Sequence, residues 1–301
     1  MERFPDNARV CFVGDSITAT YDHPARVADY YLTRFPGCGM RFYCCGVAGG
    51  TARSQRIFLK DDILCHKPTH AVLMMGVNDS ARRLLGEEKS ARRYEILKAR
   101  YDDYTKNLPM LCDELEKENV KITLCTPVPY AEYQETAQPP LRGGYALIAG
   151  YADFCRRFAA ERGYPLCDYH AYFAEKMQTE DLFGPDHIHP VEKGQYYMAK
   201  CFLEFQGLEA GEFAPIPEKY EELRRVSMLV RNIFAVELMV IGDLNYDKTT
   251  EEKLRIVQDY IDAGKAPTDY FKNITAQYMQ NKCRQDELAR LTHELTEQVM
   301  G

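Results

Sequence analysis

The sequence predicts an α/β fold in which a parallel β-sheet carries helices on both of its faces. Short apolar runs alternate with helical patterns through the first two thirds of the chain, as is typical of strand–helix–strand units. The run at 71–75 contains no polar residue, as expected of a strand that is buried on both faces. With 301 residues, of which 46% are hydrophobic, the chain can bury a large core without disulfides or metals.

Five apolar runs are predicted as strands, and helical periodicity fills most of the sequence between them. Proline and glycine residues mark the boundaries, and Pro109 is the point at which the longest helix could be interrupted. The strands are expected at 10–13, 41–45, 71–75, 120–125 and 166–167, and the helices at 24–35, 88–118, 144–162 and 192–205.

The pattern changes after about residue 210, where the chain reads as helix throughout. We predict a main domain at 1–210 and a C-terminal all-helical extension at 211–301. The stripe at 228–241 is so apolar that it must be buried. It packs either on the main domain or on a second subunit, so the extension is expected to serve packing or homo-oligomerisation.

Composition argues against several classes of partner. The net charge is −7 and no dense run of Lys and Arg is present, so we expect no nucleic-acid binding. No apolar stretch is long enough to span a membrane, and the first nine residues do not resemble a signal peptide. The eleven cysteines form no C-x-x-C pair and suit a reducing compartment. We therefore expect a cytoplasmic protein without a membrane partner.

Polar motifs follow four of the five predicted strands. Ser16 follows the first, the glycine-rich segment 46–51 the second, Asn78 the third, and Asp186 with His189 the fifth. Each motif alone could be a helix cap or an ordinary turn. Together, at the carboxyl edge of one parallel sheet, they offer a nucleophile, a base, a carboxylate and oxyanion donors. The segment 126–143, after the fourth strand, is either a substrate-binding loop or a plain surface loop.

These motifs resemble the four signature blocks of the SGNH/GDSL hydrolases, in the same order, over about residues 8–205. The blocks are Gly14-Asp15-Ser16, a second-block glycine, Gly76-x-Asn78-Asp79 and Asp186-x-x-His189. The resemblance implies a flavodoxin-like three-layer α/β/α sandwich with a central parallel five-stranded sheet. It also implies that Ser16, Asp186 and His189 form a catalytic triad.

The resemblance further implies an oxyanion hole built from the Ser16 N–H, a second-block glycine N–H and the Asn78 side chain. The second block, 47–54, is similar to that of rhamnogalacturonan acetylesterases, which indicates Gly49 rather than Gly46 or Gly50. Cys44 is a departure, because many family members carry asparagine there.

By this resemblance the protein is a serine esterase acting on short acyl esters, such as O-acetyl groups on carbohydrate or oligosaccharide. The expected chemistry needs no cofactor and no metal. A lipase, a thioesterase, an acyltransferase and a non-catalytic binding protein on the same fold remain alternatives. We assign no role to the other histidines and expect the following ones at the surface or at helix ends: His23, His66, His70, His170 and His293.

Overall fold

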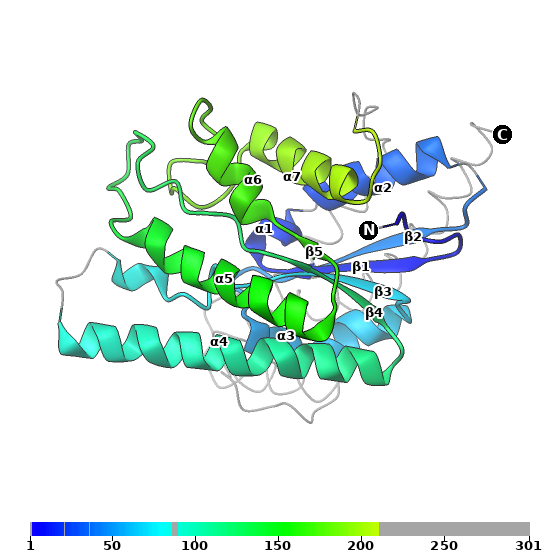
Figure 1. Ribbon diagram of the computed structural model, residues 1–301, viewed down its shortest axis with the longest axis horizontal. Helices are drawn as coiled ribbons and strands as arrows, with labels where there is room; N and C mark the ends of the chain where they lie inside the picture. The colour runs from blue at the N-terminus through cyan, green and yellow to red at the C-terminus, as the bar shows by residue number, and fades with distance from the viewer. Residues whose placement is uncertain (1, 21, 36, 86–89, 211–301) are drawn as a thin grey trace, which may run out of the picture. The chain divides into compact units, whose positions relative to one another are not determined.

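The computed structural model describes residues 2–20, 22–35, 37–85 and 90–210, and its five strands form one parallel sheet (Figure 1). The strand order is β2-β1-β3-β4-β5, the order of flavodoxin-like folds. The predicted α/β class and the five-stranded parallel sheet are therefore confirmed. The strands are β1 (Arg9–Gly14), β2 (Arg41–Gly46), β3 (His70–Met74), β4 (Lys121–Cys125) and β5 (Leu166–Cys167).

The described residues divide into two compact units. The N-terminal unit comprises Phe4–Gly50 and Ser54–His70, and the C-terminal unit comprises mainly Thr51–Arg53 and 71–210. Each unit is described on its own below.

In the N-terminal unit, β1 and β2 pair in parallel from Arg9 opposite Arg41 to Gly14 opposite Gly46. Aromatic rings pack beside the strands: the ring of Tyr31 lies 5.7 Å from that of Phe42. Burial of such large side chains contributes most to the stability of a core. The helical segments are α1 (Ser16–Ala19), α2 (Asp22–Arg34), α3 (Ala52–Ile57, which begins in the other unit), a π-helix at Leu59–Ile63 and a 3-10 turn at Leu64–His66.

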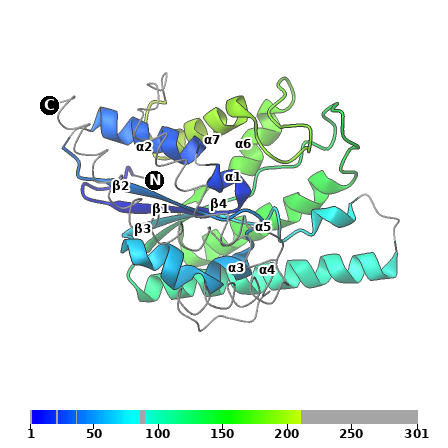
Figure 2. The ribbon, with the colours of Figure 1, turned by 180° about the vertical axis from the view of Figure 1, so that it is seen from behind.

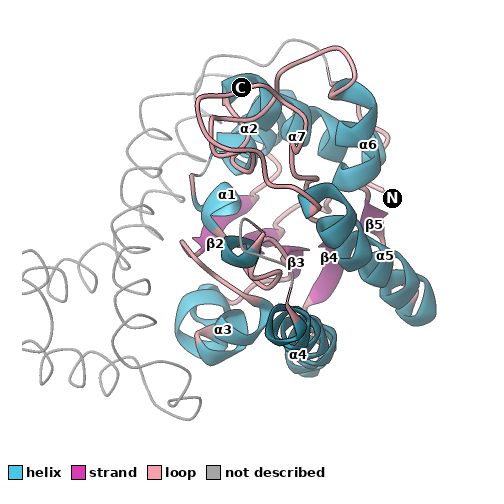
Figure 3. Cartoon of the chain, turned by 90° about the vertical axis from the view of Figure 1, so that its left-hand side faces the viewer, coloured by secondary structure: helices cyan, strands magenta, loops and turns pink. Residues whose placement is uncertain are grey.

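In the C-terminal unit, helices cover both faces of the strands (Figures 2 and 3). Helices α4 (Ala91–Lys117) and α5 (Gly144–Arg162) lie on one face. On the other lie α6 (Tyr169–Lys176) and α7 (Glu192–Phe205). A 3-10 turn spans Arg82–Leu84. Helix α4 runs through Pro109 without a break, so the interruption considered at that residue does not occur.

The long elements were predictable and the short ones were not. Helices α5 and α7 have the predicted bounds, 144–162 and 192–205. Helices α1, α3 and α6 were not predicted, because four to eight residues are too few to display a helical period. The extension 211–301 lies outside the described residues, so the boundary at 210 and a role in oligomerisation stay predictions.

The cysteines of the described residues are free thiols, and all of them except Cys65 are buried. Within the same residues, no helix combines the length and the apolar character that a membrane span requires.

Candidate active site

Ser16 lies at the turn from strand β1 into helix α1, in the N-terminal unit. The carboxylate of the preceding Asp15 is buried and accepts a hydrogen bond from the Ile17 N–H at 2.9 Å. This bond caps the first turn of α1, where backbone N–H groups have no partner within the helix. Asp15 therefore fixes the backbone on both sides of Ser16, whose side chain is half-buried.

Gln55, which the sequence motifs did not single out, joins the carboxyl ends of β1 and β2. Its side-chain amide donates to the carbonyls of Gly14 at 2.7 Å and Cys45 at 3.3 Å. The end of β2 also packs tightly against α1, because a Cβ on Gly46 would lie only 2.4 Å from the Ala19 nitrogen. These contacts hold the strand end that carries the serine. In sequence a buried amide looks like any surface glutamine, so no pattern could have identified it.

The glycines of the second block differ in what they require. A Cβ on Gly50 would lie 2.8 Å from the Val47 carbonyl oxygen, so Gly50, like Gly46, is needed for close packing. Gly49 has a φ of +75°, which favours glycine, and a Cβ there would meet no atom within 4 Å. Of the three glycines, Gly49 is thus the one beside open space.

The third block, in the C-terminal unit, is a turn organised by Asp79. This buried carboxylate accepts hydrogen bonds from the backbone N–H groups of Ala52 at 3.0 Å and Gly76 at 3.1 Å. The Tyr151 hydroxyl donates to the Asp79 carbonyl at 3.2 Å, and burial together with the Asp79 charge raises the pKa of Tyr151. Asn78, half-buried, is therefore carried on a firmly held turn.

Asp186 and His189 form an oriented pair in the C-terminal unit. One carboxylate oxygen of Asp186 contacts His189 Nδ1, and the other accepts the backbone N–H groups of Ile188 and His189, each at 3.1 Å. Since an ionised carboxylate only accepts hydrogen bonds, Nδ1 carries the proton and Nε2 is left as the basic nitrogen. Burial opposes ionisation of Asp186, but the hydrogen bonds from His189 and the two amides outweigh it and lower the pKa of the carboxyl.

A tight hairpin closes the loop that carries this pair. Phe183 and Pro190 form an isolated antiparallel bridge, and the Gly184 N–H donates to the His189 carbonyl at 2.8 Å. Helix α7 packs against the base of the hairpin, since a Cβ on Gly194 would lie 2.5 Å from the Leu182 carbonyl. The His189 backbone is thus held by its own loop.

His187, which received no role from the sequence, is fully buried and has a φ of +64°. Its Nδ1 lies 3.0 Å from the Ala131 carbonyl, and its Nε2 lies 3.0 Å from the Thr136 hydroxyl. The Ala131 N–H in turn donates to the His187 carbonyl at 2.9 Å. His187 therefore joins the segment after β4 to the loop of Asp186 and His189. The sequence showed only the Asp-x-x-His spacing and gave no sign of this distant contact.

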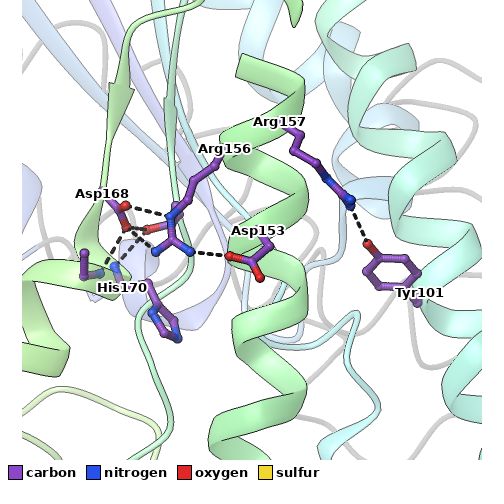
Figure 4. A network of polar contacts seen from close by, with 8 residues as sticks. Tyr101, Asp153, Arg156, Arg157, Asp168 and His170 are labelled. Atoms are coloured by element: carbon purple, nitrogen blue, oxygen red, sulfur yellow. Dashed lines mark hydrogen bonds and ion pairs between the residues drawn. The ribbon is translucent and has the colours of Figure 1, made fainter. Parts of the chain in front are cut away.

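Asp168 anchors the carboxyl ends of β4 and β5 (Figure 4). It follows β5 and accepts hydrogen bonds from Arg156 Nε at 2.7 Å and the Thr126 hydroxyl at 3.0 Å. Burial raises the pKa of the Asp168 carboxyl, but the Arg156 hydrogen bond and further contacts leave it lowered overall. The His170 ring points away from this ion pair in Figure 4, and burial lowers the pKa of that imidazole. These bonds tie the ends of β4 and β5 to helix α5.

The expectation that the remaining histidines lie at the surface or at helix ends is confirmed in its second part for His23, His66 and His170, which lie at helix ends, and is wrong for His70, which begins β3. All four are buried, where an imidazole ring can pack against aromatic rings. The His66 ring, for example, stacks on Tyr43 at 4.4 Å, and the His70 ring lies 5.2 Å from that of Phe4. The other two buried histidines are His23 and His170. Among the described residues, no group of three or more His, Cys, Asp or Glu could hold a metal ion.

A serine at a strand end and an oriented aspartate–histidine pair are the groups that serine hydrolases use. The chain belongs to the GDSL-like lipase/acylhydrolase family, whose family model matches residues 12–196. An acetylxylan esterase of Geobacillus stearothermophilus is 26% identical over 219 residues, which cover 67% of this chain and 94% of the relative. The resemblance noted in the sequence is confirmed, and the protein is a carboxylic ester hydrolase.

Solved structures with low sequence identity share the fold. A gut microbial diltiazem-metabolizing enzyme matches with a TM-score of 0.73 at 16% identity, over 99% of this chain and 97% of that one. A catalytic mutant of the Geobacillus stearothermophilus acetylxylan esterase matches with a TM-score of 0.56 at 22% identity, over 70% of this chain and 99% of that one. The solved catalytic mutants of that esterase replace a serine, an aspartate and a histidine.

Proposed function

We propose that the protein is a serine esterase that removes short acyl groups, foremost acetyl groups, from carbohydrate. The observation that carries the proposal is the Asp186–His189 pair, in which the carboxylate contacts Nδ1 and leaves Nε2 as a base. That orientation is the one a serine triad needs. In the proposed enzyme, Ser16 supplies the nucleophile from the turn after β1. The acetylxylan esterase supports this set, because its catalytic mutants replace the same three residue types.

The reaction follows from these roles. His189 Nε2 takes the hydroxyl proton of Ser16 while Oγ attacks the ester carbonyl carbon, forming a tetrahedral oxyanion. The carbon–oxygen bond to the alcohol then breaks, and the protonated His189 gives its proton to the leaving oxygen. In the second half of the reaction, water takes the place of the serine hydroxyl: His189 accepts its proton while its oxygen attacks the acyl carbon. The bond to Oγ then breaks, which releases the acid and free Ser16. Asp186 stabilises the imidazolium throughout.

Three N–H donors are proposed for the oxyanion: the backbone N–H groups of Ser16 and Gly49, and the side-chain amide of Asn78. Gly49 is supported over Gly46 and Gly50 by the open space beside it. Asn78 is supported by the rigid turn around Asp79, since preorganised donors stabilise a developing charge best. The general rule that ligand sites lie beyond the carboxyl ends of parallel strands also supports this set.

We propose carbohydrate as the alcohol part of the substrate because the chain is similar to an acetylxylan esterase. Hydrolysis of p-nitrophenyl acetate and of acetylated xylo-oligosaccharides by the purified protein tests both halves of the proposal. Ser16→Ala should lower kcat on either ester by about a millionfold, as loss of a triad serine does. Ser90→Ala is the matched control: this exposed serine caps α4, and its loss should cost only about 1 kcal/mol of stability. Hydrolysis by Ser16→Ala at the rate of the Ser90→Ala control would remove Ser16 from the mechanism.

A further inference from the structure

Tyr133 is a conspicuously exposed aromatic residue in the segment that follows β4. Its relative exposure is 85%, and single exposed rings are common on proteins. Tyr133, however, lines two adjoining cavities, of about 540 and 680 Å³. Both volumes lie in the range of small-molecule sites, about 300–1,000 Å³. The ring therefore stands between two spaces that are large enough for a ligand.

The smaller cavity combines aromatic walls with polar groups at its rim. Its walls include Tyr130, Tyr133 and Tyr145, and the residues after helix α6 contribute Met177 and Gln178. Two of the tyrosines are held in place. The Tyr130 hydroxyl donates to the Val77 carbonyl at 2.8 Å, and the Tyr145 ring lies 5.4 Å from the ring of His170. Two of the three aromatic walls are thus fixed before any ligand arrives, which lowers the cost of binding.

The charges of this cavity select the chemistry of its ligand. Glu135, Glu180 and Asp181 line it, and none of the described residues around it is a lysine or an arginine. Glu180 is held by Lys193 and by the Tyr197 hydroxyl, whereas Glu135 and Asp181 are exposed. Carboxylates repel phosphates and fatty acids but accept hydrogen bonds from hydroxyl groups. A neutral polyol with an apolar face, such as a pyranose ring, therefore fits both the aromatic walls and the acidic rim.

The cavity belongs to the same assembly of loops as Asp186 and His189. The Gln134 side chain donates to the Phe183 carbonyl at 2.7 Å, and the Thr136 hydroxyl donates to the Pro185 carbonyl at 2.9 Å. His187 adds the third connection, described above. The segment of Tyr133 is thus bonded directly to the loop that carries the proposed base.

We propose that the cavity beside Tyr133 is a glycan subsite that binds a further sugar unit of an oligosaccharide substrate. The inference rests on the proposed carbohydrate esterase function and deepens it, because it makes the enzyme one for oligosaccharides rather than for acetylated monosaccharides. The sugar stacks on Tyr133, and its hydroxyls donate to Asp181 and Glu135.

The test compares substrates of different length. For each variant, kcat/KM on acetylated xylotriose is divided by kcat/KM on p-nitrophenyl acetate. Tyr133→Ala should lower this ratio about tenfold, mainly through KM, since an aromatic contact of this kind is worth about that factor. Tyr133→Phe should keep the ratio within about twofold of wild type, because the ring remains. Tyr94→Ala is the matched control, since Tyr94 on α4 is also exposed, at 57%, and lines neither cavity.

Binding supplies a second measurement that does not depend on hydrolysis. Calorimetry with unacetylated xylotriose should show weaker binding to Ser16→Ala/Tyr133→Ala than to Ser16→Ala alone. An unchanged ratio and unchanged xylotriose binding in the Tyr133→Ala variants would overturn the subsite while leaving the esterase proposal intact. An equal loss on both esters would also overturn it, since that result means a structural role for Tyr133. Failure of the esterase proposal would show separately, as wild-type protein without activity on either ester.

Discussion

Replacing Asp186 with asparagine should remove most of the activity and little of the fold. In the wild type, one carboxylate oxygen of Asp186 accepts two backbone N–H groups at 3.1 Å and the other contacts His189 Nδ1. The asparagine oxygen can still accept the two N–H groups, so the loop keeps its shape. Its NH₂ group, however, can only donate to Nδ1, which moves the imidazole proton to Nε2. His189 then presents a donor where the mechanism needs an acceptor.

The size of the effect follows from this change of tautomer. Loss of the correct tautomer in a serine triad costs about 10⁴-fold in kcat, or about 5.5 kcal/mol of transition-state stabilisation. The cost to folding should be no more than about 2 kcal/mol, because one hydrogen bond to a charged group is lost from a partly exposed site. Hydrolysis of p-nitrophenyl acetate and urea unfolding measure the two quantities separately.

Asp102→Asn is the matched control, since Asp102 is an exposed carboxylate on α4 paired with Lys98. It should leave kcat within about twofold of wild type, because surface ion pairs contribute little. If folded Asp186→Asn retains kcat within tenfold of this control, catalysis does not depend on the tautomer of His189.

Three further predictions concern other parts of the molecule. Asn78→Ala should lower kcat about a hundredfold with little change in KM, because one oxyanion donor is lost; a near-wild-type rate on p-nitrophenyl acetate would exclude Asn78. Gly46→Ala should destabilise the protein by about 1–3 kcal/mol, since its Cβ would lie 2.4 Å from the Ala19 nitrogen. Gly150→Ala, in an open position on α5, should instead stabilise it by about 0.5–1 kcal/mol, and equal melting temperatures for the two variants would contradict the packing argument. Asp29 has a pKa raised by burial to about 7 and partly countered by Arg34, so the folded protein keeps a proton that the unfolded chain releases near roughly pH 3.9. The free energy of unfolding should therefore fall as the pH rises between these two pKa values. Asp29→Asn should remove about 3 kcal/mol of the stability that the wild type loses between pH 5 and 8. The same pH dependence in both proteins would show that Asp29 is not the group responsible.

The sequence predicted the fold well where one element carries enough residues to show its period. The apolar strands and the nineteen residues of α5 are of this kind. Helix α6 has eight residues and begins two positions after β5, so its pattern merged with the loop. Pro109 suggested a break in a helix that in fact continues, because α4 runs through this residue.

The site was predictable as a set of motifs but not as a set of contacts. Ser16 and Asn78 stand out in sequence because each follows a strand end, and Asp186 and His189 stand out through their spacing. Gln55 and His187 do not, since their partners lie between ten and fifty-six residues away and no local pattern encodes such a pairing. His187 also has a left-handed backbone, which its local sequence does not indicate. The residues that support a site are thus harder to find in sequence than those that perform its chemistry.

The nucleophile can be tested directly by covalent labelling. The protein is treated with a fluorophosphonate, and the labelled peptide is then sequenced by mass spectrometry. We expect one adduct, on Ser16, that forms in the wild type and is abolished by excess acetylated xylo-oligosaccharide. Labelling of Asp186→Asn should be much slower. An adduct on another serine, or none on an enzyme that still hydrolyses acetyl esters, would contradict the claim that Ser16 is the residue that attacks the substrate.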